Sequence, residues 1–479
     1  MNSKIDVKQL ESEPSLSIVE SFNQNVQSSE KIQVKAATGF HSNLRKIVAG
    51  LGFLAFFGCV WLQWGGHQAV LWDLSNRQFL IFGLTVWPQD LYLLSFALVI
   101  SAFGLFAVTT LYGRVWCGYA CPQSTWSWVF IWIENYVEGD RNKRRKLDKQ
   151  PWSLSKFAKK SLKHLGWFTV AFFTGLTFVG YFTPIRELVA DIISLDISLI
   201  ALSWVMLFTV LTYLNAGWLR EQVCLHMCPY ARFQAVMFDS NTMVISYDEE
   251  RGEPRTASKR KRNPEWVEGS QPAVGDCVDC TLCVQVCPTD IDIRDGLQYE
   301  CISCGKCIDA CNSVMDKMGF ARGLISYTSE NKLKHKASSF FSKRFLGYST
   351  VLTIMVGCLT FGVLTLPTVD LEVDRGRGAS LYRENYLGDI VNSYNLRVMN
   401  KTQTTQTFEV KVTGLDYKTV EGLEPVTLDV GEVSQLPVAV TVKLEKLSER
   451  VSPIQFEVWN VNDPDQNDVV ESRFVAPVH

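Results

Sequence analysis

Five long apolar stretches dominate the pattern of hydrophobic and polar positions along the chain: residues 47–64, 91–111, 165–182, 192–214 and 345–366. A helix of about 20 apolar residues crosses the hydrocarbon core of a bilayer. The first stretch follows a polar tail, residues 1–40, and has no small-residue cleavage pattern, so we interpret it as an anchor rather than a signal peptide. The pattern predicts an α-helical membrane bundle with five spans.

Beyond the last apolar stretch, the pattern changes to the alternation typical of β-strands. Branched and aromatic residues recur in residues 394–399, 408–412, 426–430, 438–444, 454–460 and 469–475. Short strands at this spacing predict an all-β sandwich over residues 370–479. This segment has no cysteine, and its histidine is the terminal His479, so we expect an interaction or spacer role rather than a metal or catalytic site.

The charge distribution predicts how the bundle is oriented. The 479 residues are 47% hydrophobic, and the net charge of -2 argues against nucleic acid as a partner. Residues 113–164 contain eleven Lys and Arg, whereas residues 65–90 contain only Arg77. By the positive-inside rule, the N-terminus, the loop 113–164 and residues 215–344 are cytoplasmic, and the sandwich is outside. We divide the part before the fifth span into a four-helix membrane domain, residues 41–247, a charged linker, residues 248–268, and a domain of residues 269–325.

Two cysteine runs in residues 269–325 predict a ferredoxin-like α+β domain with two [4Fe-4S] clusters. Both runs have the spacing C-x2-C-x2-C-x3-C. In two-cluster ferredoxins the fourth cysteine of each run binds the other cluster. We therefore assign two ligand sets: Cys277, Cys280, Cys283 and Cys311 to one cluster, and Cys301, Cys304, Cys307 and Cys287 to the other. Zinc is the alternative, but it does not require the third cysteine of each run. Asn312 stands where the bacterial pattern has proline. Cluster thiolates need a reducing compartment, which agrees with a cytoplasmic location.

Two further motifs, C-x3-C-P, follow the second and fourth apolar stretches, as in a duplicated two-helix unit. They contain Cys117, Cys121, Cys224 and Cys228. Because the following prolines suit the first helical position, we expect Cys121 and Cys228 at helix N-termini, where a thiol ionises more readily. Together the motifs offer up to four sulfur ligands, with His226 and Met227 nearby, and soft sulfur ligands select Cu(I). Zinc, another iron-sulfur cluster, or simple packing of small apolar residues remain alternatives.

The chain shows a specific resemblance to a known family. The segments that carry it are Trp61 to Gly66, Phe82 to Asp90 and Gly113 to Gln123, together with both cysteine runs. It resembles the cytochrome c oxidase accessory proteins called CcoG, also FixG or RdxA. The resemblance implies a bacterial inner-membrane protein that reduces Cu(II) to Cu(I) for assembly of cbb3-type oxidases. It further implies that the four C-x3-C-P cysteines act on copper, and that the sandwich is a periplasmic immunoglobulin-like domain.

We therefore expect a membrane electron-transfer protein that acts as a cupric reductase, with two [4Fe-4S] clusters as cofactors and copper as substrate or transient ligand. Its expected partners are the lipid bilayer, a cytoplasmic electron donor, a copper chaperone or copper-transporting ATPase, and oxidase assembly intermediates. The alternatives are a quinol dehydrogenase of the NapH-like kind and a scaffold in which the clusters only stabilise the fold.

Overall fold

The structure is a computed structural model, and it describes residues 32–75, 78–255, 275–337, 342–375, 382–402, 404–447 and 449–477. The chain forms two compact units. Unit 1 contains residues 1–56, 102–178 and 198–351, and unit 2 contains residues 57–101, 179–197 and 352–479. Most of the predicted tail and of the predicted charged linker lies outside the described residues.

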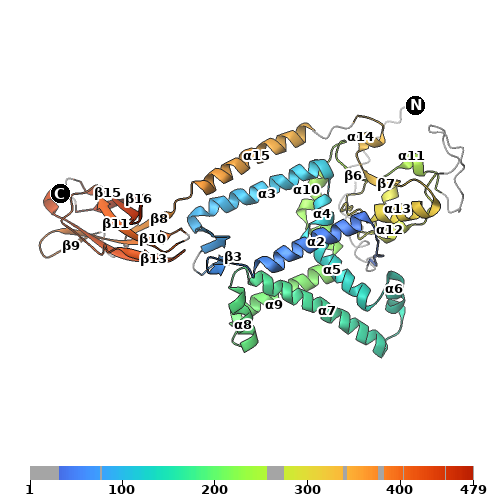
Figure 1. The fold of residues 1–479 in the computed structure, drawn as a ribbon, viewed down its shortest axis with the longest axis horizontal. Coiled ribbons are helices and arrows are strands. Elements are labelled where there is room, and N and C mark those ends of the chain that lie inside the picture. Colours follow the sequence, from blue (N-terminus) through green and yellow to red (C-terminus); the bar gives the residue numbers. More distant parts are fainter. Residues whose placement is uncertain are drawn as a thin grey trace, which may run out of the picture. The chain divides into compact units, whose positions relative to one another are not determined.

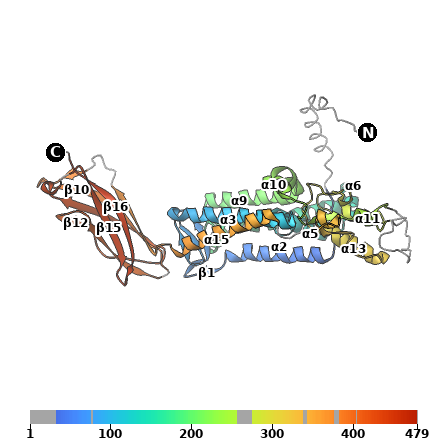
Figure 2. The same ribbon diagram turned by 90° about the horizontal axis from the view of Figure 1, so that it is seen from above.

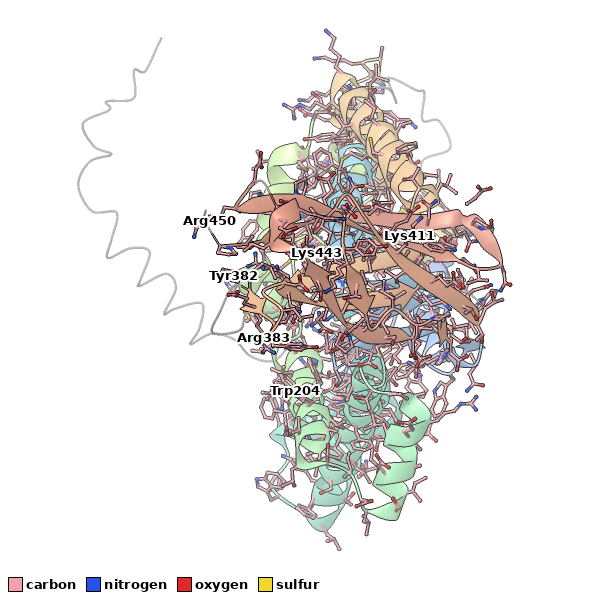
Figure 3. All side chains as sticks on the ribbon, turned by 90° about the vertical axis from the view of Figure 1, so that its left-hand side faces the viewer. Trp204, Tyr382, Arg383, Lys411, Lys443 and Arg450 are labelled. Carbon is pink, nitrogen blue, oxygen red and sulfur yellow. The ribbon has the colours of Figure 1, made fainter. Side chains whose placement is uncertain are left out.

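Long helices carry the apolar stretches (Figures 1 and 2): α2 (Phe40–Cys59), α3 (Leu91–Tyr112), α7 (Leu154–Val179), α9 (Leu199–Tyr213) and α15 (Lys343–Leu364). Within the described part of the chain, four helical segments are long and apolar enough to cross a membrane: Leu91–Tyr112, Leu154–Val179, Leu199–Leu219 and Lys343–Leu364. Helix α2 is not among them, so the predicted count of five spans is not confirmed. Large apolar side chains on these segments are exposed, such as Trp204, which projects from α9 (Figure 3).

Two predicted span boundaries differ from the structure for local reasons. Helix α2 ends at Cys59, and the chain then forms a hairpin of β1 (Gln63–Trp64) and β2 (His67–Gln68). Gly65 and Gly66 make its two-residue turn with φ of 58° and 88°, a conformation that glycine adopts without steric cost. The fourth stretch is divided into α8 (Ile185–Ser194) and α9, because Leu195 is left-handed and the Ser198 hydroxyl caps α9.

Shorter helices of unit 1 lie between the long helices in the sequence: α4 (Val115–Tyr119), α5 (Pro122–Val137), α6 (Arg141–Lys149) and α10 (Pro229–Met237). The cysteine-rich segment follows them. Its strands β6 (Val244–Tyr247) and β7 (Ile325–Thr328) pair antiparallel and pack with α12 (Leu282–Gln285) and α13 (Lys306–Met318). This segment is therefore α+β, and its buried core includes Ile245, Ile308 and Met315.

The C-terminal part of unit 2 is a β-sandwich (Figure 1). One sheet has the order β12 (Thr419–Glu421), β14 (Val433–Val442), β10 (Ile390–Asn400), β8 (Val369–Arg375), and β9 (Arg383–Glu384) also pairs with β10. The other has the order β13 (Val426–Leu428), β11 (Gln406–Thr413), β15 (Val451–Asn460), β16 (Asp463–Val475). Along the strands, buried residues alternate with exposed ones, and charged side chains such as Lys411 are among the exposed residues (Figure 3). The predicted all-β fold is confirmed, and strands β8, β9 and β12 are additions to the prediction.

The sandwich also contacts a loop within unit 2. This loop contains a sheet of β3 (Val70–Asp73), β4 (Gln78–Ile81) and β5 (Leu84–Val86). The ammonium group of Lys401 lies 2.9 Å from carboxylate oxygens of both Asp90 and Asp370 and is 5% exposed. A buried cation between two carboxylates fixes the start of α3 against the sandwich.

Candidate functional site

Three cysteines of the first run and Cys311 line one cavity in unit 1. Cys277, Cys280, Cys283 and Cys311 surround it, together with mainly apolar side chains and Arg294. Asp279 and Thr281 have positive φ, which lets the chain turn between successive cysteines. Burial raises the pKa of Cys283 to about 11 and that of Cys311 to about 12, so bound cations are needed to hold these sulfurs as thiolates.

Three cysteines of the second run and Cys287 line a neighbouring cavity. Its cysteines are Cys287, Cys301, Cys304 and Cys307, and Cys283 also contributes to the wall. Ser303 and Gly305 have positive φ here, at equivalent positions of the run. The two cavities therefore contain the same two sets of four cysteines that the sequence assigns to two clusters, and they share one wall.

The donor sets fit cubane clusters in number and type. A [4Fe-4S] cluster takes four cysteine thiolates, and each assigned set of four lines one cavity. The other lining side chains are mostly apolar, with Arg294 in the first cavity and Lys306 in the second. Among the described residues, no three His, Cys, Asp or Glu side chains converge on a point that could hold a single metal ion.

The two C-x3-C-P motifs have equivalent local structures. Cys121 is the N-cap of α5 with Pro122 in the first turn, and Cys228 is the N-cap of α10 with Pro229 in the first turn. This confirms the predicted helix starts. Cys117 lies on α4, and Cys224 lies in a short π-helical segment, η4 (Val223–Met227).

The four thiols of these motifs, which we call the four-thiol group, lie near one another. Burial raises the pKa of Cys117 to about 12, and negative charge on any of Cys121, Cys224 and Cys228 raises it further. The Cys117 thiol donates to the side-chain oxygen of the buried Gln234, at 3.3 Å. His226 and Met227 follow Cys224 but their side chains are exposed, Met227 at 64%. The group offers sulfur ligands in a half-buried setting without a preformed single-ion geometry.

A buried ionic network, which the sequence did not suggest, supports the second motif. Helix α9 continues into the π-helical segment η3 (Leu214–Leu219), and Arg220 has a left-handed φ of 43°. Its guanidinium lies 2.9 Å from Glu134, which also pairs with Arg144 at 2.9 Å, and these side chains are at most 3% exposed. Glu134 interrupts the apolar pattern of α5, which is the signal that could have identified it. The network fixes the segment that leads into Cys224.

The four-thiol group and the second cavity meet at Gly118. A Cβ atom placed on Gly118 would lie 2.7 Å from the carbonyl oxygen of Ser303 and 2.9 Å from the Cα of Cys304. Both are backbone atoms, so the absence of a side chain lets α4 approach the second run directly. The turn between Cys117 and Cys121 thus contacts the loop that presents Cys304.

Helix α2 binds the same region through its first turn. The main-chain N–H groups of His41 and Ser42 donate to the carboxylate of Asp309 at 3.1 and 2.7 Å. Asp309 lies on α13 between two cysteines of the second run. The His41 imidazole is 2.7 Å from the hydroxyl of Tyr119, which lies within the first C-x3-C-P motif. Through these contacts, the first turn of α2 connects the cysteine-rich segment to the first C-x3-C-P motif.

Family models match three parts of the chain. Residues 219–330 match a 4Fe-4S dicluster domain, and residues 94–133 match a 4Fe-4S binding domain. Residues 359–477 match the Ig-like fold at the C-terminus of FixG. The segment 94–133 contains two cysteines, Cys117 and Cys121, which are too few to hold a cubane without ligands from elsewhere in the chain.

Similar proteins are found over most of the chain. The "Nitrogen fixation protein FixG" of Rhizobium meliloti is 35% identical over 463 residues, which cover 89% of this chain and 85% of that protein. "Protein RdxB" of Cereibacter sphaeroides is 37% identical and covers 80% of this chain and 82% of its own length. "Protein RdxA" of the same organism is 38% identical and covers 74% and 76%. The crystal structure of a FixG-related protein from Vibrio parahaemolyticus is 28% identical and covers 24% of this chain and 100% of its own, with a TM-score of 0.22.

Proposed function

The chain belongs to the FixG family, and on this basis we propose that it is a membrane electron-transfer protein that reduces Cu(II) to Cu(I) during assembly of cbb3-type cytochrome c oxidase. The observation that carries the proposal is the contact at Gly118. It joins a cysteine-lined cavity that suits an iron-sulfur cluster to a group of soft sulfur ligands that suits copper.

The residues have distinct roles in this proposal. Two sets of four cysteines hold two [4Fe-4S] clusters, which supply one-electron storage when bound. Cys283, in the wall of both cavities, keeps the two sets adjacent. Cys117, Cys121, Cys224 and Cys228 bind copper as substrate. Each Cu(II) ion gains one electron and leaves as Cu(I), and a cytoplasmic one-electron donor is oxidised by the same amount.

The proposed location follows from the loop charges. Residues 113–164, with eleven Lys and Arg, support a cytoplasmic location of the cysteine-rich segment and the four-thiol group at the bacterial inner membrane. The sandwich is then periplasmic, where it would contact oxidase assembly intermediates. A copper chaperone or a copper-transporting ATPase takes the Cu(I), which soft sulfur ligands on such partners favour.

The test separates the four-thiol group from the clusters. Cys121→Ser and Cys228→Ser in the full-length, anaerobically purified protein should abolish Cu(II) reduction by the pre-reduced protein, with cluster absorbance and iron content unchanged. Cys59→Ser and Cys358→Ser are matched controls, because these cysteines belong to neither motif type, and both should keep full activity. Normal copper reduction in the first pair would refute the copper site.

Two other outcomes would change the assignment. Loss of one third of the iron in Cys121→Ser would indicate that the four-thiol group holds a third iron-sulfur cluster. Reduction of the clusters by a quinol analogue, with no effect of copper on their reoxidation, would favour the quinol dehydrogenase.

A further inference from the structure

Two buried arginines lie where the cluster segment meets the C-x3-C-P motifs. Arg45 on α2 is 6% exposed, and Arg114, the N-cap of α4, is 4% exposed. A guanidinium remains protonated in proteins, so each side chain places a positive charge in a site closed to solvent. A buried charge is strongly unfavourable unless an anion compensates it.

Arg114 connects three segments that each carry a cysteine of the site. Its Nη1 donates to the carbonyl of Tyr299, two residues before Cys301. Its Nη2 donates to the carbonyl of Ala231, three residues after Cys228. Since Arg114 itself begins α4, which carries the first motif, one guanidinium holds both motifs and the second cysteine run together. Within the described structure its Nε has no hydrogen-bond partner.

Arg45 makes a similar connection from the other side. Its Nη2 donates to the carbonyl of Ser124 at 2.9 Å, three residues after Cys121. The first turn of the same helix binds Asp309 of the second run, as described above. The Nη1 of Arg45 is buried and has no partner among the described residues.

Cysteine sulfurs lie close to both guanidiniums. Neither guanidinium forms an ion pair with Asp or Glu in the described residues. Arg114 lies close enough to Cys117, Cys224 and Cys301 to interact electrostatically with all three sulfurs. Arg45 interacts electrostatically with Cys304, Tyr119 and Cys121. Each arginine therefore acts on one cysteine of the second cavity and at least one of the four-thiol group.

We propose that Arg45 and Arg114 are counter-cations shared by the second cavity and the four-thiol group, and that they set the reduction potential of the cluster held there and strengthen Cu(I) binding by the thiols. A cluster gains one negative charge on reduction, so a nearby cation favours the reduced form and raises the potential. Thiolates that hold Cu(I) carry net negative charge, which the same cations stabilise. The copper part rests on the proposed function, whereas the part about the potential does not.

The experiment compares two substitutions at each arginine in the full-length protein with its clusters. Arg114→Gln and Arg45→Gln remove the charge but keep a hydrogen-bond donor, whereas Arg114→Lys and Arg45→Lys keep the charge. Potentiometric titrations followed by electron paramagnetic resonance give the potential of each cluster. We expect the Gln variants to lower the potential of one cluster and leave the other unchanged, and the Lys variants to match the wild type. Arg294→Gln is a control on the first cavity, and it should leave the potential of the second cluster unchanged.

Competition for Cu(I) with a chromogenic chelator tests the second part. Loss of a charge-assisted interaction should weaken Cu(I) binding by the Gln variants about tenfold or more, with the Lys variants near the wild type. Wild-type potentials in both Gln variants would overturn the proposal. If a Gln variant fails to retain its clusters, the Lys variants decide, because any clear shift in their potentials would show that shape rather than charge matters. Normal copper reduction in the Cys→Ser variants would refute the proposed function but leave the shift in potential standing.

Discussion

Replacing Gly118 by alanine tests whether the contact between α4 and the second cysteine run carries electrons to the copper ligands. The added Cβ would lie 2.7, 2.8 and 2.9 Å from three backbone atoms of residues 303, 302 and 304. Backbone atoms cannot rotate away as a flexible side chain can, so the two segments must separate. Overpacking of this kind costs about 1–3 kcal/mol. If this cost falls on the contact, the equilibrium constant for the docked arrangement falls by roughly 5- to 150-fold.

The assay is a rapid-mixing experiment under anaerobic conditions. The protein is first reduced, and Cu(II) is then added while cluster reoxidation is followed by visible absorbance. Gly118→Ala should slow reoxidation by about the factor given above while iron content stays normal. Gly104→Ala is the matched control, because a Cβ there meets nothing within 4 Å and alanine favours the helix. A wild-type rate in Gly118→Ala with intact clusters would refute the reasoning that this contact is the route.

Buried charges and the cluster ligands lead to four further predictions. Glu134→Gln leaves the charges of its two arginine partners buried and uncompensated, so the membrane part should lose about 3–5 kcal/mol, seen as a lower melting temperature; an unchanged melting curve would contradict the network. Lys401→Met should destabilise the sandwich by a similar amount, measured by protease resistance, without altering cluster absorbance. Contact with Asp370 and Asp90 raises the pKa of Lys401 above its ordinary value of 10.5 despite burial. The stability that charged Lys401 gives the sandwich should therefore persist at neutral pH and be lost only as the pH rises above that value. Loss of this stability near pH 8 would contradict the assignment. Removal of iron by a chelator should increase proteolysis within residues 277–318, because Cys277 and Cys283 belong to the hydrophobic core there, and should leave the sandwich intact. Equal resistance to protease before and after removal would show that the clusters do not support the fold.

The sequence predicted those parts of the fold that depend on local patterns. The spacing of the cysteines led to the same sets of four that line the two cavities, and the prolines after Cys121 and Cys228 correctly predicted two helix starts. Alternation correctly predicted the long strands of the sandwich. Each of these features is encoded within a few consecutive residues.

The remaining features depend on contacts between distant residues. Arg114 and Tyr299 are 185 positions apart, and nothing near either residue indicates their hydrogen bond. Gly118 resembles an ordinary turn glycine until the second run is placed against it. The predicted first span ran too far for a different reason, because hydropathy does not register that Gly65 and Gly66 form a hairpin turn.

The first turn of α2 has a consequence for the order in which the protein is completed. Its main-chain donors are satisfied by Asp309, which is translated 267 residues after Ser42 and stands among the cysteines of the second run. Until that run is synthesised and arranged, the start of α2 lacks its cap. We therefore expect biogenesis to finish late, with maturation of the iron-binding segment acting as a checkpoint: a chain deprived of iron should leave α2 frayed at its start and open to degradation.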